Sequence, residues 1–462
     1  MTQRVAIIGG GIAGVTAAWQ LAQLARAGAD VEAQLFESSG RLGGTIETVH
    51  KEGFTIECGP DAWVTEKPWA RDLVGDLGLS EELLPSNDAS RKTHIFLNGH
   101  LETMPDGMRM MVPTDLESLN SSNLFTTSAK RAYHDELTRA IDLKRAAPLN
   151  DESVASFTRR HFGEEVLTRI AAPLLSGVLG GDVERLSVQA VIPQFVAMER
   201  QHGSLIAALQ SRSTREVTAI FTTLRRGLST LIDRLVEDIP SSWINVHSPV
   251  ATISRLAKGW SLRTPTGGED EIFDAVFLSV PPHVARKLLQ PIDGEAANLM
   301  QMEASTAITV ALGFLDAQHI KLPSGFGFLV PASCTDQILA CTFVDQKFDN
   351  RVPVGGRLLR VFFGSRTAKA LLDAPDEQLS VFAQQEVTRI LGSLPKPALT
   401  LVRRWPQSLP QYAVGHLCRL EALDSRIARL PGIRLLGNAY RGVGLPDLIR
   451  DARAAARSMV PS

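Results

Sequence analysis

The sequence lacks several features that would place it in a specialised class of protein. Only four of its 462 residues are cysteines, Cys58, Cys334, Cys341 and Cys418, and they form no CxxC pair. This spacing argues against a disulfide scaffold and against a zinc module. No uninterrupted apolar run reaches the roughly 18 residues of a membrane-spanning helix. We therefore expect neither a metal site nor a transmembrane segment.

An excess of charge of one sign is also missing. Lys and Arg together number 48 against 50 Asp and Glu, which leaves a net charge of −2. Proteins that bind nucleic acid concentrate positive charge to displace counterions, so we expect no nucleic-acid partner. A strand pattern begins directly after Arg4 and leaves no room for a cleaved signal peptide, which predicts a cytoplasmic protein.

What the chain does contain is enough apolar material for a folded core, since 44% of its residues are hydrophobic and 21% are charged. The length suggests about three domain equivalents. Strand and helix patterns alternate at both ends and in a middle segment, and different material lies between them. We expect an α/β protein (α+β overall) in which one domain is assembled from separated stretches.

A βαβ unit is predicted at the start of the chain. Residues 5–8 form the short all-apolar run of a strand that is buried on both faces. A glycine-rich turn follows, and apolar residues then recur at helical spacing to about Gly28. Residues 31–36 predict the second strand, which ends at Glu37.

The glycine-rich turn carries a dinucleotide-binding pattern, Gly9-x-Gly11-x-x-Gly14. The first glycine permits the tight turn, the second lets the backbone approach a pyrophosphate, and the third allows close packing of helix on strand. Glu37 follows Gly14 by 23 residues, where a carboxylate can bind ribose hydroxyls and repels the extra phosphate of NADP. This pattern alone leaves FAD and NAD open.

Elsewhere the patterns are less regular. Residues 65–200 read as mostly helical, with one helix over 151–167. Strands are predicted over 246–253, 260–264 and 271–280, with a turn at Gly267-Gly268, and several more over 305–365. Helices are predicted over 376–391 and 446–458, on either side of a strand at 433–436.

Several blocks resemble a known family. Glu37-x-x-x-Arg41-x-Gly43-Gly44 resembles the signature of the FAD-dependent amine oxidase superfamily. Further blocks are similar to the protoporphyrinogen/coproporphyrinogen oxidase family within it. They are residues 57–62, 67–69, 77–79, 160–166, 173–178, 180–187, 405–416 and 437–447.

The resemblance implies FAD as cofactor and a set of residues along it. The glycine loop would hold the pyrophosphate, Glu37 and Ser38 the ribose, and Arg41 the linking chain. Val250 would touch the adenine end, although an ordinary core valine is the alternative, and Trp405 is either a flavin contact or a packing residue. The implied set is Gly9, Gly10, Gly11, Ile12, Ala13, Gly14, Glu37, Ser38, Arg41, Gly44, Thr45, Gly59, Pro60, Asp61, Ala62, Val250, Trp405, Val443, Gly444 and Leu445.

The implied reaction takes hydrogen from a porphyrinogen to give a porphyrin in heme biosynthesis, with O2 reoxidising FAD and releasing H2O2. Such chemistry needs no nucleophile or metal, and the sequence offers no motif for either. Protoporphyrinogen IX and coproporphyrinogen III both remain open as substrates. Rival interpretations are another flavoenzyme of the amine oxidase fold, or a non-redox flavoprotein that binds a porphyrin.

Substrate contacts are less well defined by the resemblance. The carbonyl of Gly177 would assist the reaction, with a plain turn glycine as the alternative, and His416 is either an active-site or a structural histidine. Eukaryotic members carry an arginine where this chain has Leu97, which puts the propionate partner in doubt. Lys67, Arg91 and Lys92 are the candidate cations, with solvated surface charges as the alternative.

The resemblance also suggests an organisation in three parts. A helical insertion would carry an apolar region around Met108, Met110, Met111, Leu116, Leu119, Leu124 and Phe125, which suits either peripheral membrane contact or core packing. A homodimer and a monomer both remain open. The expected division is 1–85, 205–285 and 415–462 for FAD, 86–104 and 286–414 for substrate, and 105–204 for the insertion.

Overall fold

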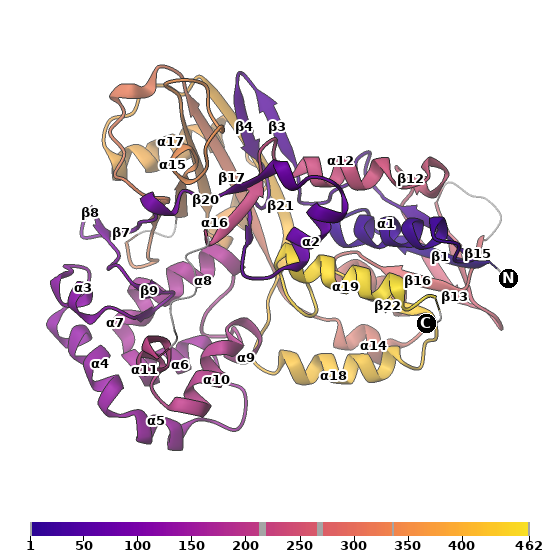
Figure 1. The fold of residues 1–462 in the computed structure, drawn as a ribbon, viewed down its shortest axis with the longest axis horizontal. Coiled ribbons are helices and arrows are strands. Elements are labelled where there is room, and N and C mark those ends of the chain that lie inside the picture. Colours follow the sequence, from indigo (N-terminus) through magenta and orange to yellow (C-terminus); the bar gives the residue numbers. More distant parts are fainter. Residues whose placement is uncertain (1, 212–218, 266–270, 335–336, 461–462) are drawn as a thin grey trace.

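A parallel sheet forms one end of the molecule (Figure 1). The computed structural model describes residues 2–211, 219–265, 271–334 and 337–460. All of the sheet's strand pairs are parallel, and its strands come from three separated parts of the chain. In sheet order they are β12 (Ile244–Asn245), β2 (Val31–Phe36), β1 (Gln3–Ile8), β16 (Ala275–Leu278) and β22 (Ile433–Leu435). The predicted α/β class is confirmed.

Both faces of this sheet are covered, which explains the apolar run in β1. Val5 and Ile7 enter one core, and Ala6 and Ile8 enter the other. The first core holds α1 (Ile12–Arg26), α12 (Ser229–Glu237), α19 (Leu445–Arg457) and α2 (Trp69–Asp76). The second holds a small antiparallel sheet and three helices. These are β13 (Thr252–Arg255), β14 (Trp260–Arg263), β15 (Glu271–Phe273), α13 (Pro282–Leu289), α14 (Gly294–Leu299) and α18 (His416–Ile427).

A second, seven-stranded sheet lies beside the first. Its strands, in order, are β21 (Leu399–Pro410), β17 (Ala304–Phe314), β20 (Arg357–Phe363), β19 (Ile338–Phe343), β18 (Gly327–Leu329), β7 (Thr93–Leu97) and β8 (His100–Thr103). Helix α17 (Asp376–Leu391) packs on it through Leu379, Ala383 and Val387. The sheet is mixed, because β18 pairs with β7 in parallel while its other strand pairs are antiparallel.

The third group is helical and lies at the lower left of Figure 1, where α8 (Ala172–Leu179) contacts β18 and β19. It comprises α3 (Leu116–Ser121), α4 (Thr127–Thr138), α5 (Ala140–Ala146), α6 (Val154–Phe162), α7 (Glu164–Val166), α8, α9 (Val188–Val191), α10 (Pro193–His202) and α11 (Leu205–Gln210). Short elements complete the described chain. They are β3 (Thr48–Lys51), β4 (Phe54–Glu57), β5 (Trp63–Val64), β6 (Leu83–Pro85), β9 (Met108–Arg109), β10 (Val112–Pro113), β11 (Phe221–Leu224), α15 (Val344–Lys347) and α16 (Ser365–Ala370).

The apolar region considered for membrane contact packs inside the helical group. Met111, Leu119, Leu124 and Phe125 belong to its buried core, and Met110 and Leu116 are half-buried against it. These positions favour the core-packing alternative. Within the described ranges, none of the helices combines the length and apolar character needed to cross a bilayer.

Several predicted elements differ from the structure. Residues 83–113 contain five short strands and a 3-10 turn at 88–90 rather than α-helices. Strands β7 and β8 form a hairpin at Asn98-Gly99, both of which have positive φ. The helix predicted over 151–167 ends at Gly163, whose φ is 85°. The strand predicted over 271–280 is two strands in two sheets, broken at Asp274, whose carboxylate accepts a hydrogen bond from the Arg4 amide.

The strand predicted over 246–253 is also wrong for most of its length. Residues 246–251 form a turn and loop in which the amides of His247 and Ser248 donate to the carbonyl oxygens of Ser39 and Glu37. Pro249 has no amide to donate to a strand ladder. The turn predicted at Gly267-Gly268 lies outside the described residues. The domain boundaries stay a prediction.

Candidate functional site

The glycine loop between β1 and α1 leaves one position open. Gly9 has φ 105°, and a Cβ there would lie 2.2 Å from the Ser279 carbonyl oxygen. A Cβ at Gly14 would lie 1.9 Å from the Gly9 carbonyl oxygen. A Cβ at Gly11, by contrast, would meet no atom of the described residues within 4 Å. The protein's own packing therefore requires Gly9 and Gly14, while the absence of a side chain at Gly11 keeps space for a ligand.

Two helices begin at this edge of the sheet. Strands β1 and β22 are parallel members of one sheet, and each is followed by a helix, α1 and α19. Arg453 Nε donates to Gln20 Oε1 over 2.9 Å, and each of these residues lies eight positions beyond the first residue of its helix. The helices thus run side by side (Figure 1). Free amides at two helix starts favour an anionic group beside them.

Glu37 stands at the end of β2, against the glycine loop. Its carboxylate accepts hydrogen bonds of 2.7 Å from the Gly10 amide and 2.7 Å from the Ser39 amide. Exposed Ser38 donates to the same carboxylate over 3.2 Å. The loop that contains Val250 lies beside Glu37, because the Ser248 amide donates to the Glu37 carbonyl. Val250 itself packs half-buried against the second core of the parallel sheet.

The segment after Glu37 folds back onto the glycine loop. The Gly43 amide donates to the Gly10 carbonyl over 2.8 Å, and a Cβ at Gly44 would lie 3.0 Å from Gly11 Cα. The Arg41 guanidinium contacts the segment that directly follows it and donates to the carbonyl oxygens of Gly44 and Ile46. The predicted residues Arg41, Gly44 and Gly11 are therefore brought together.

The segment that follows β4 packs on the same loop. A Cβ at Gly59 would lie 1.8 Å from the Thr45 carbonyl oxygen, so only glycine allows this approach. The Cys58 amide donates to the Glu47 carbonyl over 2.8 Å. Pro60, Asp61 and Ala62 follow and are half-buried. Residues 43–47 and 58–62 thus lie side by side at the edge where α1 begins.

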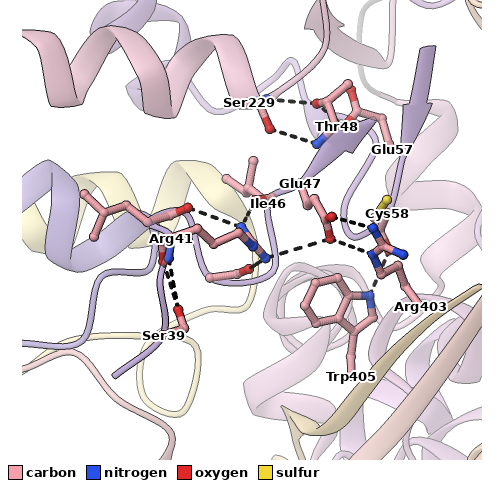
Figure 2. Close-up of polar contacts among 12 residues, drawn as sticks. Ser39, Arg41, Ile46, Glu47, Thr48, Glu57, Cys58, Ser229, Arg403 and Trp405 are labelled. Atoms are coloured by element: carbon pink, nitrogen blue, oxygen red, sulfur yellow. Dashed lines mark hydrogen bonds and ion pairs between the residues drawn. The ribbon is translucent and has the colours of Figure 1, made fainter. Parts of the chain in front are cut away.

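One face of the seven-stranded sheet holds this segment in place. Trp405 Nε1 donates to the Cys58 carbonyl over 2.8 Å (Figure 2). Thr309 Oγ1 donates to the same oxygen over 3.3 Å. Arg360 donates to the Gly59 carbonyl. Thr309 pairs with Arg403, and Ala311 with Arg360, so all of these side chains point to one face of the sheet.

Buried charges lie behind the segment. Lys347 Nζ lies 2.8 Å from Asp61 Oδ2, and fully buried Arg351 lies 3.8 Å from Glu57 Oε1. Burial would raise the pKa of Asp61, but the charges of Lys347 and Arg360 hold it below its usual value. For Glu57 burial dominates and raises the pKa to about 7. Glu57, Asp61, Arg351 and Arg360 also line a small cavity.

No reactive thiol accompanies this arrangement. Burial raises the pKa of the Cys58 thiol to about 11, so it stays protonated near neutral pH. In the described ranges no three His, Cys, Asp or Glu side chains are grouped to hold a metal ion.

The predicted residues at the C-terminal end gather at the start of α19. Gly444 is its N-cap, Leu445 is its buried first residue, and half-buried Val443 precedes them. Lys67 Nζ lies 2.6 Å from Oδ2 of buried Asp447 in the first turn. Lys67, one of the candidate cations for the propionates, is therefore already paired with a carboxylate.

The other candidate substrate residues are dispersed. Arg91 Nη1 lies 3.5 Å from Asp88 Oδ2, and exposed Lys92 precedes β7. Leu97 is buried in the core of the helical group. Gly177 lies in the last turn of α8, in a helix rather than in a connecting turn.

His416 has the contacts of a structural histidine. It is buried and stacks on Tyr412 with ring centroids 4.0 Å apart. Arg419 lies 2.9 Å from Nδ1, which must accept because a guanidinium only donates, and Nε2 then donates to the Tyr440 carbonyl over 2.9 Å. Burial lowers the pKa of His416, so the ring is neutral. These contacts favour the structural alternative.

Comparisons with known proteins agree with this geometry. The model of the flavin containing amine oxidoreductase family matches residues 12–460. Coproporphyrinogen III oxidase of Bacillus subtilis is 32% identical over 464 positions, which cover 98% of this chain and 97% of that protein. Protoporphyrinogen oxidase 1, chloroplastic, of Spinacia oleracea is 27% identical and covers 98% and 83%. A solved structure from Exiguobacterium sp. 255-15 matches with a TM-score of 0.86 at 32% identity, over 99% of both chains.

A parallel sheet with an open glycine loop, two neighbouring helix starts and a carboxylate at the end of its second strand defines a dinucleotide-binding protein. The comparisons make the choice between dinucleotides. The chain belongs to the flavin-containing amine oxidoreductase family, and its cofactor is FAD. The resemblance found in the sequence is confirmed.

Sequence reasoning missed the donors of the seven-stranded sheet. Thr309, Arg360 and Arg403 belong to no sequence motif. They lie on three different strands, and only the register of those strands shows that their side chains share one face of the sheet. Trp405 was found because it lies in a family block. Its spacing from Arg403 was a usable signal, since residues two apart on a strand share a face.

The open position gives a first prediction. Gly11→Val should fold normally, because Gly11 has φ −69° and ψ 177°, and its side chain would meet open space. It should nevertheless be purified without FAD, which the visible absorbance of the purified protein reports. Gly14→Val is the matched comparison and should lose thermal stability even without cofactor. A yellow, FAD-saturated Gly11→Val protein would contradict the assignment.

Buried Glu57 gives a second prediction. Its pKa is 4.5 when unfolded and about 7 when folded, so its contribution to stability is fully present below pH 4.5 and is lost as the pH rises through 7. The loss should be roughly 3 kcal/mol. Urea unfolding at pH 5 and pH 8 should show this drop in the wild type and not in Glu57→Gln. As a control, Gln in place of exposed Glu377 should leave the drop in unfolding free energy unchanged. If the drop persists in Glu57→Gln, the pKa of Glu57 is not its cause.

Proposed function

We propose that this protein is an oxygen-dependent coproporphyrinogen III oxidase that uses FAD in heme biosynthesis. It would dehydrogenate the porphyrinogen to the porphyrin in successive two-electron steps, with O2 reoxidising the flavin to give H2O2. The observation that carries the proposal is the open position at Gly11, in a chain whose relatives along its whole length are porphyrinogen oxidases.

The choice of coproporphyrinogen III rests on the comparisons. Relatives named coproporphyrinogen III oxidase reach 32% identity and are covered over 97% of their length. The protoporphyrinogen oxidase of spinach is 27% identical and is covered over 83%. Protoporphyrinogen IX is the second candidate, because the same fold serves both names.

The residues of the site divide the work of binding. The starts of α1 and α19, together with the Gly11 gap, would hold the pyrophosphate and its neighbouring groups, and Glu37 the ribose. Residues 59–62, Trp405 and the Val443–Leu445 turn would border the flavin ring. When bound, FAD supplies the hydride acceptor. The protein's part is then to orient the ring and to exclude water.

Three side chains fix the backbone beside the proposed position of the flavin ring. The carbonyls of Cys58 and Gly59 are held by Trp405, Thr309 and Arg360. Backbone that is fixed in this way needs little reorganisation when charge develops beside it. The Gly177 carbonyl, in the last turn of α8, is the proposed contact on the substrate side.

Anaerobic mixing tests the reaction. Addition of coproporphyrinogen III to the FAD-loaded protein should bleach the flavin absorbance, because the flavin receives a hydride. Admission of O2 should restore the absorbance and release one H2O2 for each two-electron step. A flavin that stays yellow while porphyrinogen binds would instead support a non-redox porphyrin-binding protein.

Substrate choice gives a separate prediction. The kcat/KM for coproporphyrinogen III should exceed that for protoporphyrinogen IX by about tenfold or more, since each added charge-assisted hydrogen bond contributes about 1.5–3 kcal/mol. Lys67→Ala, Arg91→Ala and Lys92→Ala should include at least one variant with a raised KM. Equal kcat/KM values for the two porphyrinogens would contradict the choice of coproporphyrinogen III. They would not contradict the assignment as an oxidase.

A further inference from the structure

Glu47 joins two parts of the fold that are distant in sequence. Its carboxylate receives two hydrogen bonds from Arg403 on β21, of 2.8 Å from Nε and 2.7 Å from Nη2 (Figure 2). Arg41 Nη2 lies 3.9 Å from the same carboxylate. The ion pair therefore connects the loop that packs on Gly11 with the edge strand of the seven-stranded sheet.

The geometry separates this pair from an ordinary surface contact. Exposed ion pairs contribute little because water and salt screen them. The side chains of Glu47 and Arg403 are only 20% and 32% exposed, and their contact is bidentate, which fixes orientation as well as distance. The hydrogen bond from Arg403 lowers the pKa of Glu47, so the carboxylate is ionised near neutral pH.

The same strand fastens the neighbouring segment. Trp405 lies two residues after Arg403, on the same face of β21, and donates to the Cys58 carbonyl. The Cys58 amide in turn donates to the Glu47 carbonyl. One short stretch of strand thus holds both segments that would lie along the cofactor, and it can set the distance between them.

We propose that Glu47 and Arg403 are positioning residues whose ion pair aligns residues 41–47 and 58–62 for FAD. The inference rests on the proposed placement of the cofactor along these segments. It does not depend on which porphyrinogen is the substrate. Neither residue needs to touch the cofactor, because each acts through the backbone that it fixes.

The test uses the full-length protein and measures cofactor binding rather than turnover. Glu47→Gln and Arg403→Gln should each raise the Kd of the apoprotein for FAD by about tenfold, the scale of coupling between groups in contact. Both should also change the visible circular dichroism of bound flavin. The double variant should be no weaker than the weaker single variant. Arg403→Lys keeps the charge without the bidentate contact, and its Kd should fall in between.

A matched ion pair elsewhere provides the control. Arg426 makes a bidentate contact with Asp293, at 2.9 and 3.1 Å, with side chains 28% and 9% exposed. Arg426→Gln should lower the melting temperature while leaving the Kd for FAD unchanged.

Several results would overturn the proposal. One is that the Glu47 and Arg403 variants bind FAD with the wild-type Kd and give the wild-type flavin spectrum. Another is that Arg426→Gln raises the Kd for FAD as much as they do. If Glu47→Gln fails to fold, Arg403→Lys decides the question, with a wild-type Kd as the contrary result. Gly11→Val reports separately on the placement of the cofactor, so the two failures are distinguishable.

Discussion

Close approach of three backbone segments is the constraint on which the site depends. Gly44 lies against Gly11, and Gly59 lies against the Thr45 carbonyl at a distance that no side chain would permit. These contacts bring segments from three places in the first sixty residues to the carboxyl edge of one parallel sheet. Helices α1 and α19 begin at the same edge, so the amides and the open space coincide.

Packing backbone on backbone leaves polar groups that need partners. The carbonyls of Cys58 and Gly59 find theirs on the seven-stranded sheet, in Trp405, Thr309 and Arg360. An unpaired buried carbonyl would cost about 1–3 kcal/mol, so these donors stabilise the fold while they orient the site. The second sheet therefore supplies hydrogen-bond partners to backbone segments that pack at the edge of the first.

The parts that could be read from the sequence are those governed by local physics. Residues 5–37 follow from a buried strand, a glycine turn and an amphipathic helix, and the helix over 376–391 follows from its periodicity. The hairpin at Asn98-Gly99 carried a local signal that a helical interpretation of the region overlooked. Strand β21 contains Pro406 and Pro410, which discourage a strand prediction, and it exists because an edge strand tolerates missing donors.

By itself, the sequence determined the dinucleotide-binding pattern, because glycines, an acid and a helix start lie within one local unit. Separate blocks along the chain carried the resemblance that implied the family and FAD. Only the tertiary structure decided that Lys67 is paired with Asp447 and that Arg403 reaches Glu47. Those facts depend on strand register and on contacts between residues hundreds of positions apart. No local pattern encodes them, since each partner is an ordinary polar residue until the sheets are assembled.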